Sequence, residues 1–316
     1  MIILDNVTKT YGRVRALDGL SMTIEDGMLY GLVGQNGAGK TTAMKIMTGL
    51  EYPDSGTVMM NGYDVPSRSA EIHELLGYVP DTFGIYGNLT VEEYMDFFAS
   101  AYGLKGLRKR KRYEDLLGQV GLDMRQDDYV DTLSRGMQQR LCLARALIHN
   151  PEILIMDEPA SGLDPRSRYE FREIISELHS QGKTLIVSSH MLSDLSEICT
   201  NIGIIEEGRL LLNGSMEDIM KTIEDTNPIR VSILNGTRDA MNVFRRNPSV
   251  RSISISGHTF MLNFSGDRED EAVLLQQLIE ADIPVREFAR EPGSLEAYFM
   301  QITDHTEEKV IMSDEY

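Results

Sequence analysis

The sequence predicts an α/β fold in which helices cover a mostly parallel sheet, followed by a small α+β domain. Nearly continuous apolar segments, Leu29–Val33, Glu152–Met156 and Thr184–Ser188, have the composition of strands that are buried on both faces. A strongly periodic helical stretch, Arg166–Gln181, separates the last two segments, and such alternation is typical of a parallel sheet. The pattern changes after Gly214, which predicts a second domain.

Length and charge limit the class of protein. The chain has 316 residues, which exceeds one average domain, and its 41% hydrophobic content is ordinary for a folded protein. A formal net charge of −18 argues against nucleic acid as the main partner, because binding to phosphates requires clustered Lys and Arg. The one dense basic run, Lys105–Arg112, is interpreted as a solvated helix face.

Cysteine usage and hydropathy indicate the compartment. Cys142 and Cys199 are too few for a disulfide framework and lack metal-ligand spacing, which fits a reducing compartment. The segment Met1–Tyr11 lacks the basic and apolar regions of a secretory signal. No window approaches the roughly eighteen consecutive apolar residues of a membrane span, so we expect none.

The N-terminal part is predicted to combine an antiparallel β subdomain with the core sheet. A helical insertion at about 88–150 interrupts the core, with apolar residues at helical spacing in Val91–Val120, such as Met95 and Phe98. The expected early strands are bounded by Gly, Asp or Asn and are Ile2–Val7, Ala16–Ile24, Met28–Val33 and Thr57–Met60.

The C-terminal part predicts the order β-α-β-β-α-β, which we interpret as a ferredoxin-like domain with a hairpin at Gly257-His258. We expect domains at 1–225 and 226–303 and a loose acidic tail at 304–316. The predicted elements are Ile229–Leu234, Arg238–Arg246, Val250–Ser256, Thr259–Phe264, Glu269–Ala281, Pro284–Ala289 and a capping helix, Ser294–Ile302.

A glycine-rich loop, Gly34–Thr42, follows the apolar strand and matches the phosphate-binding pattern G-x-x-x-x-G-K-[ST] before a predicted helix, Thr42–Gly49. Its glycines allow backbone N–H groups to surround phosphate oxygens, Lys40 reaches the β- and γ-phosphates, and the Thr41 hydroxyl ligates Mg²⁺. The expected nucleotide-binding residues of the loop are Gly34, Asn36, Gly37, Ala38, Gly39, Lys40, Thr41 and Thr42.

Two adjacent carboxylates end the strand Glu152–Met156. Asp157 is predicted to act on Mg²⁺ from its second coordination sphere, and Glu158 to accept a proton from, or to orient, the attacking water. Alone, such a strand end is as often a helix cap or a solvated turn. Together with the loop it predicts nucleotide hydrolysis.

A third motif indicates what the hydrolysis serves. Leu133-Ser-Arg-Gly-Met-Gln-Gln-Arg140 resembles the signature of the ATP-binding cassette (ABC) family and begins a predicted helix, Met137–His149. It precedes the acidic strand, and Ser161-Gly-Leu-Asp164 follows that strand, which is the family's order. The resemblance covers about the first 220 residues and implies a P-loop NTPase cassette with ATP and Mg²⁺ as cofactors.

The resemblance implies roles for further residues. Tyr11 is similar to the aromatic residue that stacks on adenine, although alone it would be interpreted as core. His190 is similar to the switch histidine that contacts the γ-phosphate, which makes it a catalytic candidate with Glu158 and Lys40. Cassettes of this family dimerise head to tail, so the signature of one chain would close over ATP in the other. The expected contributors there are Ser134, Gly136 and Asp164.

Three positions depart from the family pattern. Asp81 in Tyr78-Val-Pro-Asp stands where Gln is usual; a carboxylate there still approaches Mg²⁺ but, when ionised, donates no hydrogen bond to water. Arg135 and Met137 replace the commonest Gly and Gln of the signature, while Ser134 and Gly136 are kept. These departures concern coupling rather than ATP hydrolysis.

The resemblance predicts the ATP-hydrolysing subunit of an export-type ABC transporter, peripheral to the cytoplasmic face of the membrane. Its expected partners are a separate permease and a second ATP-binding subunit. One alternative is a soluble cassette ATPase acting on ribosomes or DNA, but those relatives carry two cassettes per chain or long heptads. Another is a nucleotide-gated clamp that barely hydrolyses ATP, against which Glu158 and His190 argue.

The segment Asp81–Phe98 is predicted to dock the permease. In the family this stretch joins the core to the helical insertion and follows the loop that senses the γ-phosphate. Here it places Phe83, Ile85 and Tyr86 within a turn-prone stretch. The alternative is that these side chains pack beneath the helical insertion.

Overall fold

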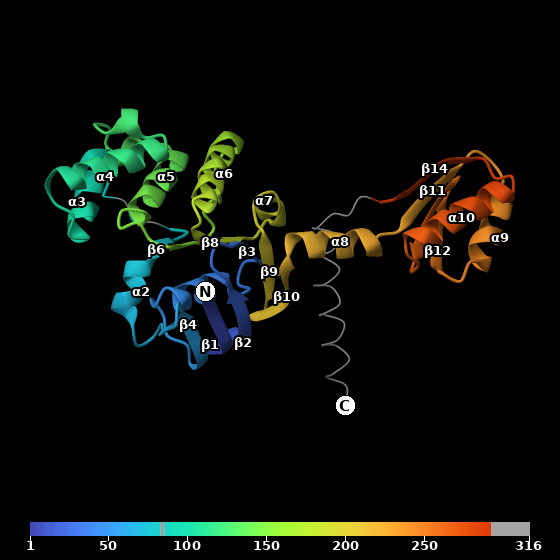
Figure 1. The fold of residues 1–316 in the computed structure, drawn as a ribbon, viewed down its shortest axis with the longest axis horizontal. Helices are drawn as coiled ribbons and strands as arrows, with labels where there is room; N and C mark the ends of the chain where they lie inside the picture. The colour runs from blue at the N-terminus through green and yellow to red at the C-terminus, as the bar shows by residue number, and fades with distance from the viewer. Residues whose placement is uncertain (83, 85, 292–316) are drawn as a thin grey trace. The chain divides into compact units, whose positions relative to one another are not determined.

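The structure is a computed structural model that describes residues 1–82, 84 and 86–291. Close packing divides the chain into two units, Met1–Met216 and Glu217–Tyr316 (Figure 1). This division falls before the predicted boundary at 225 because helix α8 (Met216–Thr226) begins there. The predicted helix Ser294–Ile302 and the tail 304–316 lie outside the described residues.

The first unit contains the predicted antiparallel sheet, with strand order β2-β1-β4-β5. Ile2 and Leu4 of β1 are buried and alternate with less buried neighbours, as expected for a sheet with one face on the core. Asn6, with φ 51°, accompanies a register shift before Val7. The strands are β1 (Ile2–Tyr11), β2 (Val14–Ile24), β4 (Ser55–Met60) and β5 (Tyr63–Asp64).

The core sheet has six strands in the order β10-β9-β3-β8-β7-β6, parallel except for β10. Every residue of β3, β7 and β8 is buried, which confirms the reading of their apolar runs. Because these strands are parallel, their carboxyl ends meet at one edge. The strands are β3 (Leu29–Val33), β6 (Leu76–Val79), β7 (Ile153–Met156), β8 (Thr184–Ser189), β9 (Asn201–Glu206) and β10 (Arg209–Ser215).

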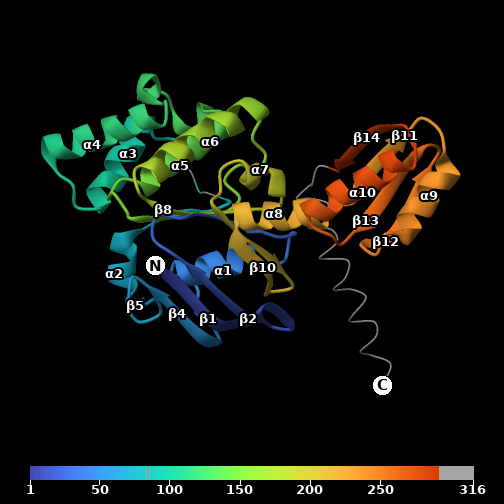
Figure 2. The ribbon, with the colours of Figure 1, turned by 45° about the vertical axis from the view of Figure 1, so that its right-hand side comes forward.

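Helices cover both faces of the core sheet (Figure 2). The apolar face of α1, which includes Ala43 and Met44, shares one core cluster with β1, β2, β3 and β7, so this helix packs between the two sheets. On the other side, α5 and α6 begin at Ser134 and Asp164, whose side chains cap them. The helices are α1 (Lys40–Met47), α2 (Ser69–Leu75), α5 (Arg135–Ala146), α6 (Pro165–Ser180) and α7 (Leu192–Ser196).

The helical insertion consists of α3 (Val91–Ala101) and α4 (Gly106–Gln119), not one continuous helix. A turn separates them, and in it Gly103 has φ 78°, a conformation that glycine adopts without strain. A reciprocal capping box between Thr90 and Glu93 starts α3. Two short 3₁₀ helices follow, η1 (Asp123–Arg125) and η2 (Val130–Thr132).

The basic run of α4 is only partly a solvated face, which corrects the interpretation from sequence. Lys109 pairs with Asp96 of α3 at 2.5 Å. Arg112 donates hydrogen bonds to the carbonyl oxygens of Leu147 and Ile148, at the C-terminal end of α5. A cation at that position satisfies carbonyl groups that lack helical partners and interacts favourably with the helix dipole. Part of the run therefore joins three helices.

In the second unit a four-stranded antiparallel sheet has the order β12-β13-β11-β14. Apolar residues of the sheet, including Val231 and Phe260, pack against Phe244 of α9 and Leu274 of α10. The elements are β11 (Ile229–Ile233), α9 (Thr237–Arg246), β12 (Val250–Ser256), β13 (Thr259–Phe264), α10 (Arg268–Glu280) and β14 (Val285–Arg290).

No helix within the described residues is long and apolar enough to cross a membrane. Both cysteines, Cys142 and Cys199, are free and buried.

Candidate functional site

The loop Gly34–Thr42 joins β3 to α1 at the carboxyl edge of the core sheet. A Cβ on Gly34 would lie 2.3 Å from the carbonyl oxygen of Ile205, and one on Gly39 2.5 Å from that of Ala16. Gly39 also has φ 110° where α1 begins. Close approach of a neighbouring backbone therefore requires glycine at both positions, and the positive φ requires it at Gly39 as well.

Lys40 lies inside this loop, and its side chain is only 5% exposed. The ammonium group donates hydrogen bonds to the carbonyl oxygens of Gly34 at 2.6 Å and Gln35 at 3.1 Å. It also lies 3.2 Å from Oε1 of Glu158. The loop thus places one buried positive charge next to the carboxylate at the end of β7.

Asp157 and Glu158 are held by one hydroxyl group from the neighbouring strand. Ser188 of β8 donates to Oδ1 of Asp157 at 2.7 Å and accepts from the backbone N–H of Glu158 at 2.8 Å. Glu158 has φ 47°, a left-handed conformation that is uncommon for residues other than Gly, Asn and Asp. Such strain is found at functional sites, where the surrounding contacts maintain it.

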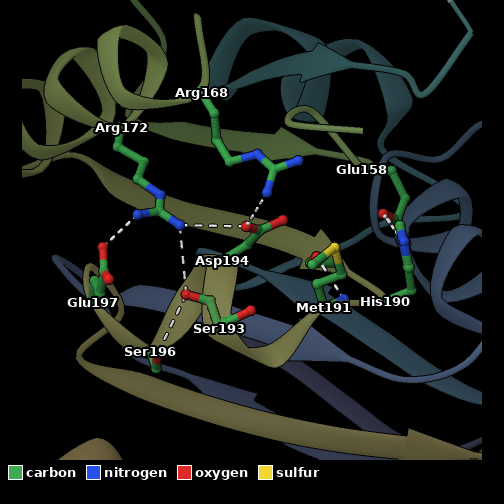
Figure 3. A network of polar contacts seen from close by, with 10 residues as sticks. Glu158, Arg168, Arg172, His190, Met191, Ser193, Asp194, Ser196 and Glu197 are labelled. Carbon is green, nitrogen blue, oxygen red and sulfur yellow. Dashed lines mark hydrogen bonds and ion pairs between the residues drawn. The ribbon is translucent and has the colours of Figure 1, made fainter. Parts of the chain in front are cut away.

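His190 follows β8 directly, and its imidazole Nδ1 lies 2.8 Å from Oε2 of Glu158 (Figure 3). The side chain of Glu158 is 13% exposed and that of His190 40% exposed. The carboxylate of Glu158 therefore lies between two groups that are distant in sequence, Lys40 on one oxygen and His190 on the other.

The signature forms a second cluster, at the N-termini of α5 and α6. Ser134 accepts a hydrogen bond from the N–H of Met137 at 3.3 Å. Asp164 accepts from the N–H and hydroxyl groups of Ser167, and the hydrogen bond from that hydroxyl is the main cause of a lowered Asp164 pKa. A Cβ on Gly136 would lie 2.5 Å from Ser167 Oγ, so glycine lets the two helix starts approach. The guanidinium of Arg135 lies against Gly162 in the same cluster.

The two clusters are separate within one chain. Among residues 1–82, 84 and 86–291, no hydrogen bond or ion pair joins Ser134 or Gly136 to the loop Gly34–Thr42. The family resemblance implies such separation, because it assigns the signature to ATP held by a second chain.

Two further candidates lie at the periphery. The ring of Tyr11 is 44% exposed, so it is not a core residue, and burial followed by the charge of Glu51 raises the pKa of its hydroxyl. The side chain of Thr42 opposes that rise in pKa, which puts Tyr11 beside the loop. Asp81, after β6, is exposed.

The described residues contain no cluster of three His, Cys, Asp or Glu side chains that could hold a metal ion alone. They do fit a cation that is shared with phosphates. Asp157 is only 1% exposed, and its Oδ2 is buried without a hydrogen-bond partner. A buried acceptor of this kind is costly unless a ligand or water satisfies it.

Sequence reasoning missed the bridging role of Ser188 and the contacts of Asp194, which accepts a hydrogen bond from Arg168 at 3.0 Å and interacts with Arg172 at 3.3 Å. The only available signal was polar character at the end of a buried strand for Ser188. Nothing in the sequence pairs Asp194 with residues of α6, because its partners are more than one element away.

The chain is similar to proteins of known family. The family model described as ABC transporter matches residues 17–161. The linearmycin resistance ATP-binding protein LnrL of Bacillus subtilis is 31% identical over 309 residues, covering 97% of this chain and 99% of the relative. The Nod factor export ATP-binding protein I of Ralstonia nicotianae is 30% identical over 305 residues, covering 96% and 94%.

Solved structures are similar to about two thirds of the chain. An ATP-binding subunit of an ABC transporter has a TM-score of 0.63 at 29% identity and covers 70% of this chain and 92% of its own. A dimeric ATP-binding cassette in a post-hydrolysis state, bound to ADP and phosphate, has a TM-score of 0.63 at 27% identity and covers 68% and 99%.

Proposed function

Because this chain belongs to the ABC transporter ATP-binding family, we propose that its ATPase activity drives export through a separate membrane permease. The observation that carries this proposal is the carboxylate of Glu158, which lies between Lys40 of the phosphate-binding loop and His190. Relatives named for resistance and for export match nearly the whole chain, the second unit included, which favours transport over a soluble cassette function.

The phosphate-binding loop binds the nucleotide, and the end of β7 provides the residue that activates water. Lys40 and the N–H groups of the loop bind the phosphates of ATP, and the ring of Tyr11 stacks on the base. Glu158 orients the attacking water and accepts its proton, while His190 holds Glu158 and contacts the γ-phosphate. The buried ammonium group of Lys40 lies 3.2 Å from Oε1 of Glu158 and so helps to fix the position of this carboxylate.

Thr41, Asp157 and Asp81 are the residues that would hold Mg²⁺. The buried, unpartnered Oδ2 of Asp157 supports this assignment, and the hydroxyl of Ser188 keeps the carboxylate in a fixed orientation. A bound Mg²⁺ supplies positive charge to the phosphate oxygens during transfer.

The signature cluster binds ATP held by a second copy of the chain or by a related subunit. Two helix N-termini, of α5 and α6, converge there, and each attracts negative charge. Arg135 adds a positive charge for which the described residues provide no ion-pair partner. Ser134 and Gly136 would contact the γ-phosphate, and Asp164 would lie at the same interface.

The permease docks on the cytoplasmic side, next to the helical insertion. Tyr86 and Phe97 are 51% and 53% exposed and contact each other edge to face at 5.8 Å. Nearby is a groove of about 230 Å³ between the core and α3. Its lining residues are Thr48, Leu50, His73, Leu76, Tyr78, Phe98, Tyr102, Arg145 and Ala146.

We also propose that the second unit is an accessory domain of the ferredoxin-like type. The alternation of β11, α9, β12, β13, α10 and β14 and the antiparallel strand order support this proposal.

Purification of the tagged chain from membranes in mild detergent tests the proposed function. We expect an integral membrane protein to co-purify in stoichiometric amount and to stimulate ATP hydrolysis. Recovery of the chain with ribosomes or DNA instead would overturn the transport proposal.

A further inference from the structure

Helix α7 begins two residues after His190 and has only five residues, Leu192–Ser196. So short a helix is not stable by itself, because the conformational entropy lost in forming its first turn exceeds the stabilisation from the hydrogen bonds of that turn. Its N-cap, Met191, provides no side-chain hydrogen bond. The turn that follows His190 must therefore be held by contacts with other elements.

The buried side chain of Leu195 lies against Gly31 of β3, and the polar contacts of α7 come from α6. Asp194, whose side chain is 7% exposed, accepts a hydrogen bond from Arg168 at 3.0 Å and from Arg172 at 3.3 Å (Figure 3). Arg172 also donates to the carbonyl oxygen of Ser193 at 3.5 Å and pairs with Glu197. The two arginines are four residues apart, so they lie on one face of α6, and both donate hydrogen bonds to Asp194 of α7.

This contact connects two parts of the proposed active site. Helix α6 begins at Asp164, in the signature cluster, and α7 continues the chain from His190. A carboxylate that accepts hydrogen bonds from two arginines is held in a defined orientation. Loss of its charge would leave Arg168 without its counter-ion and Arg172 with Glu197 alone.

We propose that Asp194 is a positioning residue for ATP hydrolysis, which holds the first turn of α7 so that His190 stays in contact with Glu158. The inference rests on the proposed function. It predicts that Asp194 affects the chemical step through His190 and not the binding of ATP, since no hydrogen bond or ion pair among the described residues joins Asp194 or its two arginines to the loop Gly34–Thr42.

The simplest alternative is that the contact only stabilises the fold. Four variants separate the two roles: Asp194→Asn, Asp194→Glu, His190→Ala, and the double variant that combines Asp194→Asn with His190→Ala. Glu170→Gln is the matched control, because Glu170 also lies on α6 and pairs with Arg140 and Arg166, whereas no ion pair among the described residues joins it to α7.

Single-turnover hydrolysis and nucleotide affinity are measured for each variant with the full chain. For Asp194→Asn we expect hydrolysis to slow about 5- to 20-fold through loss of orientation, with the affinity for ATP changed less than about 2-fold. Asp194→Glu should recover most of the rate, and Glu170→Gln should retain it. In the His190→Ala background, Asp194→Asn should slow hydrolysis no further.

Two results would overturn the proposal: an unchanged rate in Asp194→Asn, or rate losses that multiply in the double variant. If Asp194→Asn does not fold, Arg168→Gln removes one donor and leaves Arg172, and it must show the same dependence on His190. Failure of the proposed role of Glu158, on which this inference rests, is distinguishable, because in that case Glu158→Gln would hydrolyse ATP at the wild-type rate.

Discussion

Nδ1 of His190 lies 2.8 Å from Oε2 of Glu158, a side-chain contact that joins the ends of two adjacent parallel strands in addition to the hydrogen bonds of Ser188. The other oxygen of Glu158 lies 3.2 Å from the ammonium group of Lys40. Both of these groups contact the carboxylate of Glu158, one on each oxygen. The carboxylate therefore has a defined position before any water or phosphate approaches it, which is what a general base requires.

Glu158→Gln should retain ATP binding but slow hydrolysis by about two to four orders of magnitude, the usual contribution of a positioned base. Glutamine keeps the shape of the side chain and its contact with Lys40 but accepts no proton. Steady-state phosphate release measures the rate, and a fluorescent nucleotide measures the affinity. Undiminished release would remove Glu158 from the mechanism.

Lys40→Ala should abolish productive binding of MgATP instead, since it removes the buried charge that faces the phosphates. The fold should survive, because the partners of Lys40 are two carbonyl oxygens of its own loop and one carboxylate. Circular dichroism checks the fold, and nucleotide titration measures the binding of ATP. Wild-type affinity in this variant would contradict the assignment of the loop.

Contiguous parts of the site were predictable from the sequence. The loop Gly34–Thr42 and the pair Asp157-Glu158 each lie within a few residues, and their residue types follow from phosphate and proton chemistry. The strands β12 and β13 were predicted to the residue, because a clear turn at Gly257 separates two alternating runs. Local patterns with strong stop signals are the predictable ones.

The remainder depends on tertiary contacts. Arg168 and Asp194 are 26 residues apart, and neither position has a local pattern that indicates a partner. Arg112, which belongs to a basic run interpreted as solvated, caps a helix 36 residues away. Strands β9 and β10 were not predicted, and α7 was missed because five residues are too few to show helical periodicity.

ATP should drive dimerisation of Glu158→Gln through the signature cluster, since hydrolysis no longer releases the nucleotide. Ser134→Asp should abolish this dimer while keeping the N-cap of α5, because aspartate caps as well as serine does but repels the γ-phosphate. Thr90→Asp is the matched control: it keeps the N-cap of α3 and adds the same charge outside the signature. Sedimentation with and without ATP measures the dimer.

A dimer that forms equally well with Ser134→Asp would contradict the shared site. The permease is included in a parallel experiment, so that a requirement for the membrane partner is detected as ATP-dependent dimerisation in its presence only.

Both thiols should be unreactive in the folded protein. Burial raises the pKa of Cys142 to about 11 and that of Cys199 to about 12, from the ordinary thiol value of 9.0. Below pH 9 both cysteines are protonated in both states, so they add no pH dependence. Above pH 9 the unfolded chain loses these protons first, so the free energy of unfolding falls as the pH rises toward about 11.

Titration with a thiol reagent at pH 8 checks this expectation. We expect almost no reactive thiol in native buffer and two reactive thiols per chain in denaturant. Two thiols that react rapidly in the native protein would show that the segments around Cys142 and Cys199 open readily. Urea unfolding across the same pH range measures the change in stability.

Tyr86 and Phe97 should be needed for the permease and not for the fold. Phe83 and Ile85, which the docking hypothesis also names, lie outside the described residues. Tyr86 and Phe97 are about half exposed. Tyr94, whose ring centroid lies 6.5 Å from that of Tyr86, is 1% exposed. Truncating an exposed ring leaves no cavity, while truncating a buried aromatic costs about 3–5 kcal/mol.

The combined variant Tyr86→Ala and Phe97→Ala should therefore keep its melting temperature and its affinity for ATP but lose the permease on purification. Tyr94→Ala, in contrast, should show a large fall in melting temperature. Tyr63→Ala is the matched surface control, because Tyr63 is 41% exposed on β5, outside the helical insertion. A complex that survives loss of both rings, with a collapsed melting temperature, would assign Tyr86 and Phe97 to the packing of the helical insertion and refute the docking surface.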